Sequence, residues 1–255
     1  MTLIIGIICD DGVVMAADSA STDMTAQVKQ PTSDKLRRIA AKSMVLGGSG
    51  NVGLLQGIRE SVEGYAGTAP SIKNVRRDLK ALILPHQRQA IEDHIPLQIP
   101  GMNQPPTACL LVGGYAGNTP LLLEFEANGE DTCYDAALGN FCAIGSGKIY
   151  AHALFRTHLT RKRDLRLGKI LAFRVVSDSI DLAHYGLAHP VHMWAITPSA
   201  VSIISDDEKN ELEETVKIWR ELESEALGKL LAPVQDAPLA VPTPEEAAAE
   251  ASKGT

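Results

Sequence analysis

Thr2 is the residue whose type and position most directly suggest chemistry in this sequence. It follows only Met1, and methionine is normally trimmed before a small residue, so we expect a mature chain that begins with threonine. A terminal threonine holds a hydroxyl nucleophile and an amine base in one residue. An α-amino group has a typical pKa of about 7.7–8.0, so it is a usable base near neutrality, unlike lysine at about 10.4. Met-Thr is also an ordinary start, so Thr2 alone does not establish catalysis.

Two charged residues, Asp18 and Lys35, could support such a nucleophile. An Asp-Gly turn at 10–12 is of the kind that closes a tight hairpin, and the strand after it would return Asp18 to the chain start. Lys35 lies at the point where regularly spaced apolar residues begin again. Taken singly, the aspartate could cap a turn and the lysine could be a solvated surface charge.

Glycines follow a strand-like run at 43–46. Gly47-Gly48-Ser49-Gly50 would end that strand in exposed backbone, where glycine dihedrals let a peptide N–H point at a ligand oxygen. A later segment, Ala143-Ile144-Gly145-Ser146-Gly147, repeats a Gly-Ser-Gly element, although such a sequence is also an ordinary loop or helix entry.

The order of these elements resembles the β-type subunits of the proteasome family of N-terminal-nucleophile hydrolases, over roughly residues 2–200. The resemblance implies that Thr2 is the nucleophile and that Lys35 lies beside its hydroxyl and favours an alkoxide-like state. Asp18 would fix and neutralise Lys35. The N–H of Gly50 would stabilise the oxyanion, and Ser146 would help to position the terminal amine.

One region departs from the family pattern. The family usually carries an Asp and a Ser before paired glycines, whereas Ala183 and Gly186 fall nearest those two positions here. Asp178 and Asp181 are the two candidates to replace the acid. The way in which the amine is held is therefore open.

Two other functions fit parts of the sequence. Gly48-Ser49-Gly50-Asn51-Val52-Gly53 is a literal G-x-G-x-x-G, which would indicate a dinucleotide-binding oxidoreductase. That fingerprint needs a second strand, yet a loop at 64–70 and a helix at 71–84 are expected next. A non-catalytic structural ring subunit of the proteasome fold is the other alternative. The joint presence of a nucleophile and two charged partners favours the enzyme.

Grouped strands and paired helices argue against simple βαβ alternation. The elements expected are strands at 2–9, 13–17, a pair within 36–46, 108–113, 121–125, 141–144, 192–196 and 201–204, and helices at 52–65, 71–84, 148–159, 170–183 and 207–231. The resemblance implies an α+β fold, a four-layer αββα sandwich of two antiparallel sheets between helix layers. We expect one proteasome-type domain over 2–231 and a disordered Ala-, Pro- and Glu-rich tail over 232–255.

Composition excludes several classes of function. A length of 255 residues with 45% hydrophobic residues supports one sizeable core, and a net charge of −7 offers no basic stripe for nucleic acid. No apolar run approaches the roughly twenty residues of a membrane span, and no signal peptide is visible.

The histidines at 184, 189 and 192 are expected to be structural rather than metal ligands. Four cysteines without short paired spacing indicate reduced thiols and a cytoplasmic protein (Cys9, Cys109, Cys133 and Cys142).

The residues predict a threonine endopeptidase, and the resemblance implies a self-compartmentalising one among the bacterial proteasome homologues, which include the HslV, ancestral β-subunit and betaproteobacterial branches. Thr2 would be exposed by removal of Met1, and no cofactor or metal is expected. The resemblance implies a homo-oligomeric ring or stacked rings that act on proteins or peptides, with helical assemblies also conceivable. An unfoldase ATPase partner is implied by the resemblance only.

Overall fold

The computed structural model describes residues 1–23, 28–31, 35–39, 43–65, 71–97, 105–157, 163–183 and 186–231. The chain divides into two compact units, Met1–Val216 and Lys217–Thr255. The first unit contains both large sheets. The tail predicted over 232–255 lies outside the described residues.

The first large sheet is antiparallel and has the order β10-β1-β2-β11-β12. Its strands are β1 (Ile4–Ile8), β2 (Val13–Ala17), β10 (Phe141–Ile144), β11 (His192–Ile196) and β12 (Val201–Ile203). The predicted hairpin of β1 and β2 is confirmed, with Ile4 opposite Ala17. On its other side Ile4 lies opposite Ile144 in β10. The residues that follow β2 and β10 are thereby brought to the two sides of the N-terminus.

The second large sheet is also antiparallel, in the order β5-β6-β7-β8-β9. Its strands are β5 (Leu36–Arg38), β6 (Met44–Gly50), β7 (Ala108–Ala116), β8 (Thr119–Phe125) and β9 (Asp131–Cys133). A separate hairpin pairs β3 (Ala20–Asp23) with β4 (Val28–Pro31). Side chains of the second sheet alternate as a strand requires: Val45 and Leu111 join the core between the sheets, whereas Leu46 and Leu110 join the core under two helices.

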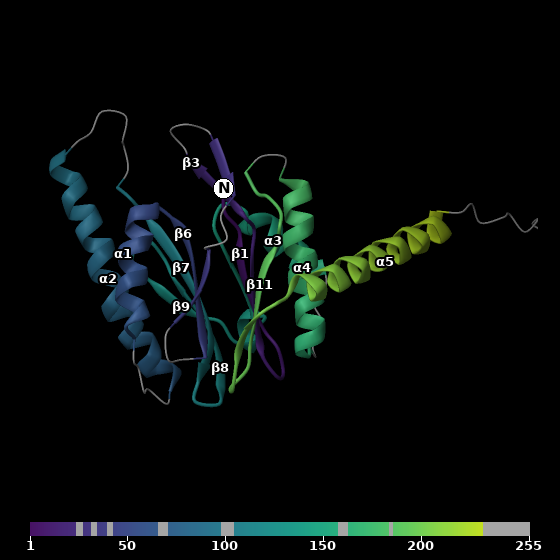
Figure 1. The fold of residues 1–255 in the computed structure, drawn as a ribbon, viewed down its shortest axis with the longest axis horizontal. Coiled ribbons are helices and arrows are strands. Elements are labelled where there is room, and N and C mark those ends of the chain that lie inside the picture. The colour runs from purple at the N-terminus through teal and green to yellow at the C-terminus, as the bar shows by residue number, and fades with distance from the viewer. Residues whose placement is uncertain are drawn as a thin grey trace, which may run out of the picture. The chain divides into compact units, whose positions relative to one another are not determined.

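Helices cover the outer face of each sheet, as Figure 1 shows for α1 and α2 beside β6 and β7, and for α3 and α4 beside β1 and β11. The helices are α1 (Val52–Glu63), α2 (Ile72–Leu97), α3 (Lys148–Thr157), α4 (Leu165–Leu182), α5 (Asp206–Leu231) and a short 3-10 turn η1 (Ala136–Leu138). Two helix layers around two antiparallel sheets form the αββα sandwich that the sequence predicted. Among the residues that the structure describes, no helix combines the length and apolar composition needed to cross a bilayer.

Helix α2 is much longer than predicted. We expected it to end at residue 84, directly before Pro85, but it continues to Leu97, so the predicted end was wrong. Leu79, Ile83 and Gln87 recur every four residues and are all buried, so the packed stripe crosses the proline. Pro85 itself is exposed. Proline inside a helix removes a hydrogen bond, a loss that this tertiary packing outweighs.

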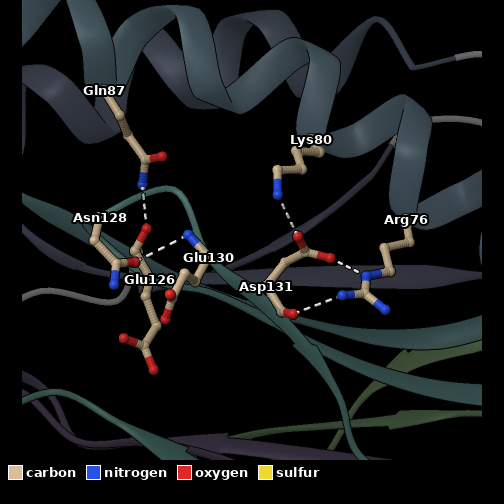
Figure 2. A network of polar contacts seen from close by, with 7 residues as sticks. All are labelled: Arg76, Lys80, Gln87, Glu126, Asn128, Glu130 and Asp131. Atoms are coloured by element: carbon tan, nitrogen blue, oxygen red, sulfur yellow. Dashed lines mark hydrogen bonds and ion pairs between the residues drawn. The ribbon is translucent and has the colours of Figure 1, made fainter.

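Polar contacts anchor both halves of α2 to the second sheet (Figure 2). The side-chain amide of Gln87 donates to the backbone oxygen of Glu126 at 2.9 Å, as Figure 2 shows. It also donates to the backbone oxygen of Ala108, at 3.1 Å. About two and three turns before Gln87, Lys80 Nζ lies 2.6 Å from Asp131 Oδ1, and Arg76 binds the other carboxylate oxygen. These contacts hold the helix on β7, β8 and β9.

Helix α4 begins earlier than predicted, at Leu165 rather than near residue 170. Two aspartates satisfy its first N–H groups: Asp11 Oδ1 accepts from Leu165 at 2.6 Å, and Asp164 Oδ1 accepts from Leu167 at 2.8 Å. Asp11 belongs to the β1–β2 turn, so the same turn that closes the hairpin also fixes the start of α4.

Candidate active site

A buried ion pair joins Asp18 and Lys35. Lys35 Nζ lies 2.5 Å from Asp18 Oδ1, and the two side chains are 7% and 0% exposed. The same Oδ1 accepts the N–H of Leu3 at 2.8 Å, and Oδ2 accepts the N–H of Ala20 at 2.9 Å. Three donors therefore fix the carboxylate. Because it binds the residue directly after Thr2, the ion pair lies at the N-terminal end of β1.

The pair also joins the two sheets. Asp18 follows β2 of the first sheet, whereas Lys35 precedes β5 of the second. Their neighbours Ala17 and Leu36 both belong to the core between the sheets. The ion pair therefore closes one end of that core.

The electrostatic state of Lys35 reflects two opposing causes. Burial lowers the pKa of its ammonium below the ordinary value of 10.5, because the charged form is desolvated. The charge and hydrogen bond of Asp18 offset part of this effect. The carboxylate thus helps to keep a cation in a buried position near Thr2.

The end of β10 holds Thr2 from the other side. The Thr2 nitrogen donates to Ser146 Oγ at 3.2 Å, and the Gly147 N–H donates to the Thr2 carbonyl oxygen at 3.1 Å. Gly145 has φ of 91°, and a Cβ there would come within 2.2 Å of the same carbonyl oxygen. The predicted Gly-Ser-Gly element therefore lies against the predicted nucleophile, in an approach that requires glycine at position 145.

Gly50, the predicted oxyanion donor, is the last residue of β6 and has φ of 136°. The strand end reaches the same region, since a Cβ at Gly145 would lie 3.1 Å from Ser49 Oγ. The backbone of β6 thus approaches the segment that binds Thr2. The role of the Gly50 N–H stays a prediction.

The glycines at 48–53 do not form the dinucleotide fingerprint. β6 runs antiparallel to both of its neighbours, β5 and β7, and α1 leads on to α2. The described residues after Gly53 therefore do not build the parallel strand–helix–strand unit that this fingerprint requires. The structure overturns the oxidoreductase alternative.

The region that departs from the family pattern is apolar at the two matching positions. Ala183 is buried, and Gly186 has φ of 102° and packs against the Met1 side chain. Arg174 donates to Asp178 at 3.2 Å within helix α4, which does not favour Asp178 as a replacement acid. Asp181 is exposed on the last turn of α4, and its substitution for the acid stays a prediction.

Ser19 contributes a contact that the sequence reasoning missed. It is buried, its N–H donates to the Ala188 carbonyl at 2.8 Å, and its hydroxyl donates to the Pro190 carbonyl. Ser19 directly follows Asp18, so these two hydrogen bonds connect the loop after α4 to the chain beside the ion pair. The adjacent Asp18-Ser19 sequence was the available signal, but the partner lies about 170 residues away.

His192 lies near the ion pair because β11 pairs with β2. It stands in β11 directly opposite Ala17, the residue before Asp18. Burial lowers its pKa below 6.5, and the positive charges of Lys209 and Lys35 lower it further. A neutral imidazole therefore borders this end of the sheet at neutral pH. His184, one of the other histidines of the sequence, lies outside the described residues.

Comparison with known proteins identifies the family of this chain. A family model described as "Proteasome subunit" matches residues 2–187. The chain belongs to the proteasome subunit family. The resemblance predicted from its motifs is thereby confirmed.

One similar solved structure is the Anbu (Gly-1) mutant from Hyphomicrobium sp. strain MC1. The two share 17% sequence identity, with a TM-score of 0.68, over 90% of this chain and 97% of that chain. This likeness supports the αββα fold alone. No curated protein matches the sequence.

Proposed function

We propose that this chain is a threonine peptidase subunit of a self-compartmentalising assembly. Removal of Met1 would expose the α-amine of Thr2, and the chain would hydrolyse peptide bonds through the Thr2 hydroxyl. The observation that carries the proposal is the buried Asp18–Lys35 ion pair, whose carboxylate binds the N–H of the residue next to Thr2. A buried ion pair adjacent to a terminal nucleophile has an electrostatic use there that a surface pair would not have.

The proposed reaction assigns the proton transfers to Thr2 itself. Its hydroxyl oxygen attacks the substrate carbonyl carbon while its α-amine accepts the hydroxyl proton. The tetrahedral intermediate then expels the amine half of the substrate, which takes this proton from the Thr2 amine. Water hydrolyses the remaining ester and regenerates both groups.

The other residues would stabilise charge or orientation during these steps. The Lys35 ammonium favours the developing alkoxide, and Asp18 holds that ammonium in place. The N–H of Gly50 would bind the oxyanion, a contact of about 3 kcal/mol in comparable enzymes. Ser146 accepts a hydrogen bond from the Thr2 nitrogen and would orient its lone pair.

Covalent labelling tests the proposal. A peptidyl epoxyketone reacts with both the hydroxyl and the α-amine of a terminal threonine, so it reports the nucleophile and the loss of Met1 together. We expect intact-mass spectrometry of the full-length protein to show loss of Met1 and one adduct per chain, located on Thr2. Thr2→Ala should abolish the adduct.

Thr157→Ala is the matched control, because it makes the same chemical change at an exposed helix end. It should label like the parent chain. If the parent chain assembles but neither loses Met1 nor forms an adduct, the peptidase proposal fails. The non-catalytic structural ring subunit would then be the better description.

Assembly and location are part of the proposal. Proteasome-family membership supports a homo-oligomeric ring or stacked rings with the reactive ends inside. All four cysteines are free thiols in the structure, which is consistent with a cytoplasmic protein. An unfoldase ATPase partner has family membership as its support.

A further inference from the structure

The Met1 side chain fills a space that Gly186 provides. A Cβ at position 186 would lie 2.6 Å from Met1 Cγ and 2.7 Å from both Cβ and Sδ. No Cβ would fit there without displacing Met1. Gly186 also has φ of 102°, a conformation that L side chains rarely adopt. Both the backbone conformation and the contact with Met1 therefore favour glycine at this position.

The wall of this recess is anchored independently of Met1. Leu187 is buried, and it packs with Leu3 over Gly147, where a Cβ would meet the two side chains at 3.1 and 3.0 Å. The next residue, Ala188, accepts the N–H of Ser19 at 2.8 Å. These contacts join the loop to β10, β1 and the end of β2. The recess should therefore persist when Met1 is removed.

In the proposed reaction, the leaving half of the substrate lies on the side of Thr2 that faces the Gly186 recess. The Thr2 amine must give its proton to the leaving nitrogen, which requires an approach to about 3 Å. Met1 is bonded to this same Thr2 nitrogen, and its side chain occupies the recess. The space vacated by Met1 therefore adjoins the residue that follows the scissile bond.

We infer that the Gly186 recess, once Met1 has been removed, binds the side chain of the substrate residue that follows the scissile bond. It selects a long apolar side chain, such as methionine or leucine, over glycine or aspartate. The inference rests on the proposed peptidase function, and it assigns part of the specificity of that site. The space beside Gly186 already accommodates a methionine side chain, so it is large enough for this class of residue.

Substrates that differ only after the scissile bond test the inference. Internally quenched peptides with methionine, leucine, glycine or aspartate at that position are compared with the full-length assembled protein, and mass spectrometry verifies the cleaved bond. We expect kcat/KM for methionine and leucine to exceed that for glycine by at least about 10-fold, since small apolar differences change specificity about 10–200-fold. Epoxyketone labelling serves as the reference, because it involves no leaving residue.

Gly186→Ala should remove the preference, because its methyl group enters the recess; the result is read as the ratio of kcat/KM for the methionine and glycine peptides within this variant. Gly139→Ala is the matched control: Gly139 also has positive φ, of 82°, but nothing lies within 4 Å of its added Cβ. It should retain the preference. If Gly186→Ala does not fold, the parent chain still decides the question through its own preference.

Two results would overturn the inference in distinguishable ways. Normal labelling at Thr2 with equal cleavage of the methionine and glycine peptides would refute the recess and leave the peptidase function standing. Absence of both labelling and cleavage would refute the peptidase function, and the inference with it.

Discussion

Asp18→Asn tests whether the ion pair at the N-terminus is as important as its burial implies. The substitution preserves shape but removes the charge that faces Lys35. It also turns one carboxylate oxygen into an NH2 donor, although Asp18 accepts from Lys35, Leu3 and Ala20. One buried donor must therefore lose its acceptor. Removing one partner of a buried pair costs about 3–5 kcal/mol, and we expect the free energy of unfolding to fall by that amount.

Urea unfolding followed by circular dichroism measures this loss, at one fixed protein concentration because assembly stabilises subunits by mass action. Asp78→Asn is the matched control: its pair with Arg77 is exposed, with side chains 31% and 72% accessible. That change should cost less than about 1 kcal/mol. The double variant Asp18→Asn/Lys35→Met, which leaves no unpaired buried charge, should recover part of the stability. Equal losses in Asp18→Asn and Asp78→Asn would refute the reasoning.

Three further predictions concern the reactivity of Thr2. Ser146→Ala should slow epoxyketone labelling by about 2- to 12-fold, since one neutral hydrogen bond contributes about 0.5–1.5 kcal/mol, and its exposed position predicts almost unchanged unfolding. Gly145→Ala should slow labelling by about 100-fold, because its methyl group must displace the Thr2 carbonyl, and unchanged labelling would contradict the 2.2 Å approach. The lowered pKa of Lys35 predicts that labelling falls at alkaline pH below 10.5, where the ammonium is lost. In Asp18→Asn this fall should move to lower pH, since the carboxylate that raises the pKa is gone, and a profile that does not move would contradict the assignment.

The sequence was sufficient to predict the parts of the site that depend on local structure. An Asp-Gly turn between two short apolar runs implies a hairpin, and a hairpin of this length returns Asp18 to Leu3, where the hydrogen bond is found. The Gly-Ser-Gly element was recognised by its motif. Its contact with Thr2 depends on the pairing of β1 with β10, which joins residues about 140 positions apart.

Other features were not predictable because distant contacts determine them. Helix α2 crosses Pro85 because Gln87, further along, binds backbone oxygens of the second sheet. The contact of Ser19 with the loop after α4 has no local signature. Hydrophobic periodicity and helix propensity describe one segment of the chain at a time. The length of α2 and the contact of Ser19 depend instead on residues in another layer of the fold.

The Asp18–Lys35 pair shows why the fold and the proposed chemistry are difficult to separate in this protein. Asp18 follows a strand of one sheet and Lys35 precedes a strand of the other, and the flanking residues Ala17 and Leu36 belong to the core between the sheets. Packing of that core therefore sets the 2.5 Å approach of Lys35 to Asp18, and the carboxylate in turn fixes Leu3 beside Thr2. A substitution that shifts one sheet against the other should therefore change the position of the Lys35 ammonium relative to Thr2, even when the substituted residue contacts none of the site residues. Reactivity at Thr2 is then a sensitive report of how the two sheets pack.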